Sequence, residues 1–102
     1  LALLDLVAQN PNEISLVCLA PLTNIALAAT IWSEFFDNVK EVFIMGGNYR
    51  GIGNETECAE FNFHYDAEAA FMVFQKLTCP TVICLTKHVW MLGLIRIGVL
   101  TF

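Results

Sequence analysis

Three short apolar runs, separated by helical patterns, restrict the folds that this chain can adopt. The runs span residues 14–19, 41–45 and 81–86, and each contains Val and Ile. Nearly continuous apolar runs of this length are typical of strands covered on both faces. Strictly alternating helices and buried strands predict an α/β fold with an open, mostly parallel, Rossmann-like sheet and flanking helices. Because the pattern begins with a helix instead of a strand, we interpret the chain as a fragment of such a sheet.

Local signals set the bounds of the predicted helices. The first helix spans residues 1–8 and ends at Asn10-Pro11-Asn12, because proline prevents the helix from continuing. The second begins at Pro21 and ends between Trp32 and Asn38, and its apolar positions recur at helical spacing: Leu22, Ile25, Ala26 and Ala29. Asp66 caps the third helix, whose buried side we expect to consist of Ala70, Phe71, Val73, Phe74 and Leu77.

The composition raises a packing problem. Hydrophobic residues make up 57% of the 102 residues and charged residues only 15%, whereas soluble chains have about 45–50% and about 25%. A domain this small cannot bury so much apolar surface, so a partner, a membrane or further chain must cover it. Residues 89–102 are largely apolar, with Arg96 as their one charged residue, but a membrane-spanning helix needs about 20 residues. We therefore expect no membrane span, and a membrane-associated tail ranks last among the hypotheses.

Charge and cysteine usage exclude further classes. The net charge of −5 disfavours binding to nucleic acid, which requires clustered basic residues. The four cysteines form no CxxC pair and have no zinc-ligand spacing with a histidine. We expect all four to be reduced, which favours a cytoplasmic location.

A long polar loop from Gly46 to Asn62 follows the second predicted strand. Loops of this length in a compact domain usually carry function. Its acidic residues could form a solvated surface or a site for a polyol or a cation, and the sequence leaves both open. Asn54, Glu60 and Asn62 provide two amides and a carboxylate, a set of donors and acceptors suited to the neighbouring hydroxyls of a sugar. Ligands of parallel sheets bind at the carboxyl ends of the strands, where this loop begins.

The motifs taken together resemble the inosine–uridine-preferring nucleoside hydrolase family. They occur in the family's order over about residues 1–85: Ala20-Pro21-Leu22-Thr23-Asn24, Met45-Gly46-Gly47, Gly53-Asn54, Ala59-Glu60-Phe61-Asn62 and Asp66-Ala67-Glu68-Ala69-Ala70. The resemblance implies an open α/β fold, hydrolysis of the N-glycosidic bond of ribonucleosides and a bound calcium ion, and it allows a homo-oligomer. It also implies that Asn54, Glu60 and Asn62 bind the ribose hydroxyls, that Met45 lines the sugar pocket, and that the backbone carbonyl of Thr23 ligates calcium.

The sequence also departs from the family pattern. It has no counterpart of the family's N-terminal aspartate cluster or of its later His-Asp pair, so we assign no catalytic residue, and most calcium ligands are missing. We divide the chain into the central part of a nucleoside hydrolase domain, residues 1–86, and a divergent apolar tail, residues 87–102. We expect little or no turnover from this chain alone. The alternative is a catalytically inactive interaction module that binds a partner through its apolar faces.

Overall fold

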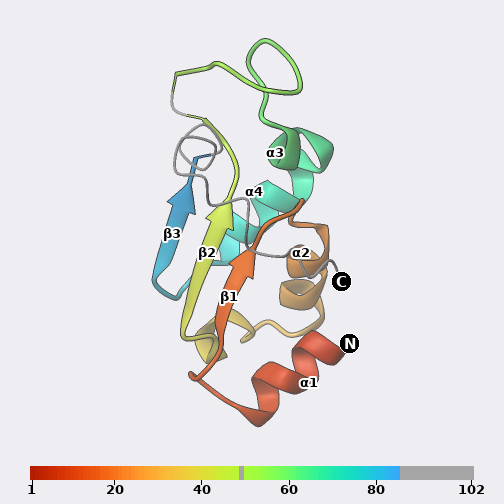
Figure 1. Ribbon diagram of the computed structural model, residues 1–102. Coiled ribbons are helices and arrows are strands. Elements are labelled where there is room, and N and C mark those ends of the chain that lie inside the picture. Colours follow the sequence, from red (N-terminus) through yellow and green to blue (C-terminus); the bar gives the residue numbers. More distant parts are fainter. Residues whose placement is uncertain (49, 86–102) are drawn as a thin grey trace.

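Helices and strands alternate along the chain, as the apolar runs predict. The computed structural model describes residues 1–48 and 50–85, and Figure 1 shows their arrangement. The elements are α1 (Ala2–Gln9), β1 (Ser15–Cys18), α2 (Thr23–Ile31), the 3₁₀ helix η1 (Phe36–Asn38), β2 (Glu41–Met45), α3 (Phe61–Tyr65), α4 (Ala67–Lys76) and β3 (Thr81–Cys84). The predicted tail lies outside the described residues, so the division at residue 86 stays a prediction.

The three strands form one parallel sheet in the order β1-β2-β3, which confirms the predicted fold class. Val17, Phe43 and Val82 lie side by side across the sheet, one from each strand. Parallel neighbours need a crossover connection, and the helices between the strands provide it. All three strands therefore end at the same edge of the sheet, where the long loop begins (Figure 1).

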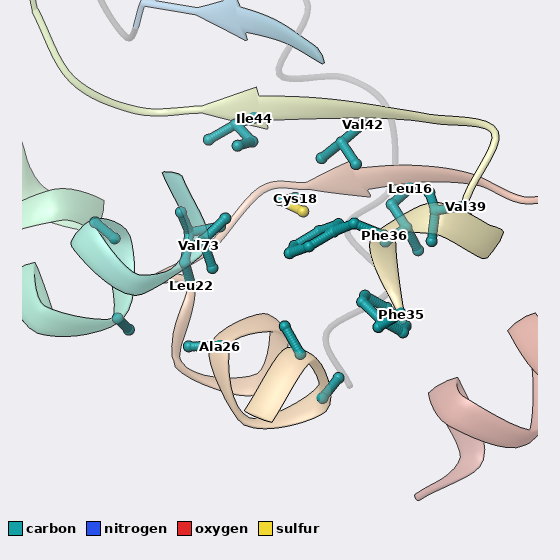
Figure 2. Packing of buried hydrophobic residues seen from close by; sticks show 14 of the residues in the cluster. Leu16, Cys18, Leu22, Ala26, Phe35, Phe36, Val39, Val42, Ile44 and Val73 are labelled. Atoms are coloured by element: carbon teal, nitrogen blue, oxygen red, sulfur yellow. The ribbon is translucent and has the colours of Figure 1, made fainter. Parts of the chain in front are cut away.

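The sheet is covered on one face only, so the prediction of doubly buried strands is wrong for the described residues. Burial alternates along β1 and β2: Leu16, Cys18, Val42 and Ile44 are buried, whereas Val17 is 63% exposed. Successive side chains of a strand point to opposite faces, and the described helices pack against one of them. In Figure 2 the buried side chains of both strands point toward the same helices.

Two neighbouring phenylalanines fill the middle of the covered face, and the sequence analysis did not single them out. Phe35 and Phe36 lie at the start of η1, are almost fully buried, and meet edge to face with ring centroids 5.2 Å apart. Leu22 and Ala26 of α2 and Val73 of α4 complete this core (Figure 2). The core therefore joins both crossover helices to β1 and β2.

The buried side of α4 differs from the prediction. Ala69, Ala70 and Val73 are buried, but Phe71 is 65% exposed and Phe74 is also exposed. The side chains at 69, 70 and 73 share one face at helical spacing, and Phe71 lies on a different face. Phe74 packs edge to face on Phe63 of α3, with centroids 5.7 Å apart. The predicted cap is confirmed, because Asp66 accepts a hydrogen bond from the Ala69 N–H.

Other differences are local. α2 ends at Ile31, one residue before the predicted range, and the predicted loop contains the start of a helix, α3, that the sequence pattern did not reveal. All four cysteines are free thiols. Among the described residues, no helix is both long and apolar enough to cross a bilayer.

Candidate functional site

The polar residues predicted to bind ribose are brought together where β2 ends. Met45 is the last residue of β2, and its backbone carbonyl accepts a hydrogen bond of 2.8 Å from the Asn62 side-chain amide. Asn62 is only 4% exposed. Alternation along β2 places the Met45 side chain on the face opposite to Val42 and Ile44. The structure thus connects α3 to the end of β2 through the amide of Asn62.

Glu60 is the N-cap of α3 and ties this short helix to the glycine pair. Its Oε1 accepts from the Asn62 N–H at 3.0 Å, and its Oε2 accepts from the N–H groups of Gly47 and Phe63 at 2.9 and 3.1 Å. The side chain is 4% exposed, so these bonds replace the water that the carboxylate loses. The usual N-cap residues are Ser, Thr, Asp and Asn, which is why the sequence pattern did not predict a helix start here.

The glycine pair leaves room for an aromatic ring. Gly47 has φ +72°, a conformation that favours glycine, and a Cβ atom there would lie 2.9 Å from the Phe63 ring. A Cβ atom on Gly46 would also meet the Phe63 ring. The backbone after β2 can therefore pass this close to the Phe63 ring only because Gly46 and Gly47 have no side chain. The sequence predicted a loop beginning here but not this close approach.

Asn54 joins the loop to the start of α3. Its Oδ1 accepts a hydrogen bond of 2.8 Å from the Phe61 N–H, and its side chain is exposed. The Ala59 carbonyl accepts hydrogen bonds from three successive N–H groups, those of Asn54, Glu55 and Thr56. Two hydrogen bonds therefore hold Asn54 in place, one from its N–H to the Ala59 carbonyl and one from the Phe61 N–H to its side chain. Glu55 and Glu57 are exposed, which supports the solvated interpretation for these two acids.

Two side-chain atoms of the site are not used by the hydrogen bonds described above. Within residues 1–48 and 50–85, no hydrogen-bond partner is found for the Asn54 Nδ2 or for the Asn62 Oδ1. The first is a donor and the second an acceptor. A carboxylate has about four acceptor positions, so Glu60 retains one beyond its three backbone donors. A donor and two acceptors of this kind can bind a pair of sugar hydroxyls.

Thr23 belongs to a neighbouring contact between α2 and α4. Its hydroxyl donates a hydrogen bond of 2.6 Å to Asp66 Oδ2, while Asp66 Oδ1 caps α4. The Thr23 hydroxyl, and after it the Ala69 N–H, lower the pKa of the Asp66 carboxyl below its ordinary value. In the described part of the chain, no hydrogen bond links Thr23 to Asn54, Glu60 or Asn62. The sequence had suggested a role only for the carbonyl of Thr23.

The described residues do not fit a calcium ion by themselves. Ca²⁺ takes about six to eight oxygen ligands, mainly carboxylates and carbonyls. Residues 1–48 and 50–85 contain no group of three or more Asp, Glu, His or Cys side chains that could hold a metal. The Thr23 carbonyl is one ligand at most, and the neighbouring Asp66 carboxylate already accepts two hydrogen bonds.

Comparison with known proteins establishes the family. The family model described as inosine-uridine preferring nucleoside hydrolase matches residues 1–94, so this chain belongs to the inosine-uridine preferring nucleoside hydrolase family. The chain is 49% identical over 72 residues to a probable uridine nucleosidase 2 of Oryza sativa subsp. japonica, covering 71% of this chain and 21% of that protein. It is 48% identical over 75 residues to the inosine-uridine preferring nucleoside hydrolase of Crithidia fasciculata, covering 72% of this chain and 24% of that protein.

Solved structures agree with this result. A plant nucleoside hydrolase, the PpNRh1 enzyme, superposes with a TM-score of 0.79 at 32% identity, covering 84% of this chain and 27% of that one. An inosine-uridine preferring nucleoside hydrolase from Bacillus anthracis superposes with a TM-score of 0.76 at 25% identity, covering 84% and 30%. The chain spans between a fifth and a quarter of the curated relatives quoted above.

Proposed function

We propose that this chain supplies part of the ribose pocket of a ribonucleoside hydrolase. The reaction is hydrolysis of the N-glycosidic bond of a purine or pyrimidine ribonucleoside to the free base and ribose. The observation that carries the proposal is the linkage of three polar residues to one strand end: Asn62 bonds the Met45 carbonyl, Glu60 bonds the Gly47 N–H, and Asn54 bonds the start of α3. The names of the relatives support the same reaction.

The proposed role of these residues is to bind and orient the sugar. Departure of the base develops oxocarbenium character on the ribose ring, and hydrogen bonds to its hydroxyls that strengthen at this stage lower the barrier. Asn54 Nδ2 would donate to one hydroxyl, while Asn62 Oδ1 and the Glu60 carboxylate would accept from another. Met45 would lie beside the sugar at the end of β2. We assign no general acid or base among the described residues, and no step depends on calcium.

We also propose a cytoplasmic location, because all four cysteines are free thiols. Cysteines of secreted proteins are usually paired in disulfides.

Nuclear magnetic resonance of the ¹⁵N-labelled chain tests the ribose pocket directly. Inosine and uridine should shift the backbone amide signals of Gly47, Phe61 and Asn62, whereas 2′,3′-dideoxyinosine, which lacks the two hydroxyls, should shift them far less. In the same samples we expect almost no release of free base, since we assign no residue among those described to the activation of water.

Asn54→Asp provides the matched variant for this experiment. It keeps the oxygen that accepts from the Phe61 N–H but replaces the free amide donor, so nucleoside binding should weaken by about tenfold, the loss of one hydrogen bond. Gln75→Glu makes the same chemical change at an exposed position of α4 and should leave binding unaltered. Equal shifts with inosine and its dideoxy form would contradict the proposal, as would the absence of shifts at the site.

A further inference from the structure

The face of the sheet opposite the helices is an apolar surface that the described helices do not cover. We define the outer face by Val17 of β1, Phe43 of β2, and Val82 and Cys84 of β3. Val17, Phe43 and Val82 are in register as one row across the three strands. Val17 is 63% and Val82 51% exposed. A contiguous apolar row across a whole sheet is a surface that folded proteins normally cover.

Among the described residues, Ser15 and Glu41 bound this surface at the amino ends of the strands. At the amino ends of β1 and β2, the Ser15 hydroxyl donates a 2.7 Å hydrogen bond to Glu41. Register places Ser15 and Glu41 next to each other, before the apolar row. The row is therefore open toward the carboxyl ends of the strands. The chain leaves β3 at this end, after Cys84.

We propose that residues 89–102 of the same chain cover the outer face. These fourteen residues are apolar except for Arg96 and Thr101 and the two glycines. They follow β3 after only four residues, 85–88, and β3 itself ends at the open end of the row. The three strands are about 10 Å apart from first to last, and fourteen residues reach about 21 Å even when helical. The segment is long enough to lie across all three strands.

Charge favours the same occupant. All ten acidic residues of the chain and only three of its five basic residues precede residue 86, so that part carries −7, and Lys87 and Arg96 make the remainder positive. Opposite net charges attract the tail to the body of the chain. The proposal also accounts for the high hydrophobic content of the chain, because the apolar tail and the apolar outer face would bury each other. It does not rest on the hydrogen bonds of Asn54, Glu60 and Asn62, although Met45 of the proposed pocket lies on this same face, in register with Cys84.

Thiol labelling of the full chain tests this proposal. Cys84 lies on the outer face, Cys58 is an exposed thiol of the loop, and Val17→Cys places a probe on the strand farthest from the tail. With a covering tail, Cys84 and the probe at position 17 should react with iodoacetamide at least about tenfold more slowly than Cys58. Labelling at the rate of Cys58 would overturn the proposal.

Two variants of the tail test whether the tail itself protects the two thiols of the outer face from labelling. Leu94→Asp and Ile95→Asp, made separately, change neighbouring side chains that point in different directions in any regular structure. At least one should raise both labelling rates toward that of Cys58, whereas Thr101→Asp, which adds the same charge without removing an apolar group, should not. If neither variant raises them, the tail does not cover the face. Protection that disappears on dilution, together with a dimer in light scattering, would assign the face to a second copy and overturn the proposal.

Cys18 shows whether each variant is still folded. It lies in the core, and burial raises the pKa of its thiol to about 11. It should therefore stay unlabelled in every variant that retains the fold.

Discussion

At the scale of single residues, the site depends on polar groups that satisfy the backbone. Glu60 accepts three backbone N–H groups from two segments, and Asn62 returns one donor to the end of β2. Buried N–H groups that lose their acceptor are costly. The residues that resemble ribose ligands therefore also hold the loop and α3 in place, and their variants must be judged for stability as well as for binding.

Glu60→Gln should destabilise the chain by about 1–3 kcal/mol, because its amide offers one oxygen where the carboxylate offers two. Glu60→Ala should cost more, since all three N–H groups then lack an acceptor. Urea denaturation followed by circular dichroism measures both free energies of unfolding. Glu57→Gln, at an exposed position of the same loop, is the control and should differ from the parent chain by less than about 0.5 kcal/mol.

The hydrogen bond from Thr23 to Asp66 should make the stability of the folded chain depend on pH in the acidic range. The pKa of Asp66 is lowered in the folded chain from an ordinary value of 3.8, so its carboxylate contributes stability above that pH. The contribution is lost as the pH falls below 3.8 through the lower folded pKa. Thr23→Val should lower the melting temperature at pH 7 and lower it less at pH 2. Thr23→Ser keeps the hydroxyl and should behave like the parent chain, and an equal loss at both pH values would contradict this account.

At the scale of elements, the loop between β2 and α3 is held by close backbone approaches within itself. Gly53 packs so tightly against the Ala59 backbone that a Cβ atom would overlap it. The same region is joined by the three N–H groups that meet the Ala59 carbonyl. These backbone contacts thus give the loop a defined structure, although few of its residues are apolar.

Gly53→Ala should therefore lower stability more than Gly51→Ala. At Gly51 nothing lies within 4 Å of a new Cβ atom, and the cost is only that of φ +65°, about 1–2 kcal/mol. At Gly53 the backbone itself must move, which should also displace Asn54 and shift the amide signals of α3. Similar melting temperatures for the two variants would show that the loop is looser than its hydrogen bonds indicate.

At the scale of the whole molecule, the chain contains one covered sheet face and an incomplete set of site residues. The core of Phe35, Phe36 and the crossover helices accounts for how residues 1–85 pack. The described residues include the groups that we propose to bind the sugar, but they contain too few oxygen ligands for calcium. The described part of the chain thus folds like its structural neighbours but does not by itself form a calcium site.

Calcium should not stabilise this chain. A ligand raises the melting temperature only through sites that the folded chain has, so millimolar calcium should change it by less than about 1 °C. Differential scanning calorimetry in calcium, in magnesium and in EDTA measures this. A rise of several degrees specific to calcium would reveal a site that the geometry of residues 1–85 does not provide.

The sequence alone determined the order of elements, the parallel sheet, the Asp66 cap and the family, because apolar periodicity, helix breakers and ordered motifs are local properties. Only the tertiary structure showed that the sheet has one covered face, that Phe71 is exposed, and that Glu60 begins a helix. These outcomes depend on which surfaces meet. The residue pattern of a strand shows that its side chains are apolar. Whether each face of the strand is buried depends on which other elements pack against it. The hydrogen bonds of Glu60 to Gly47 and of Thr23 to Asp66 join residues 13 and 43 positions apart, and no local pattern encodes such pairs.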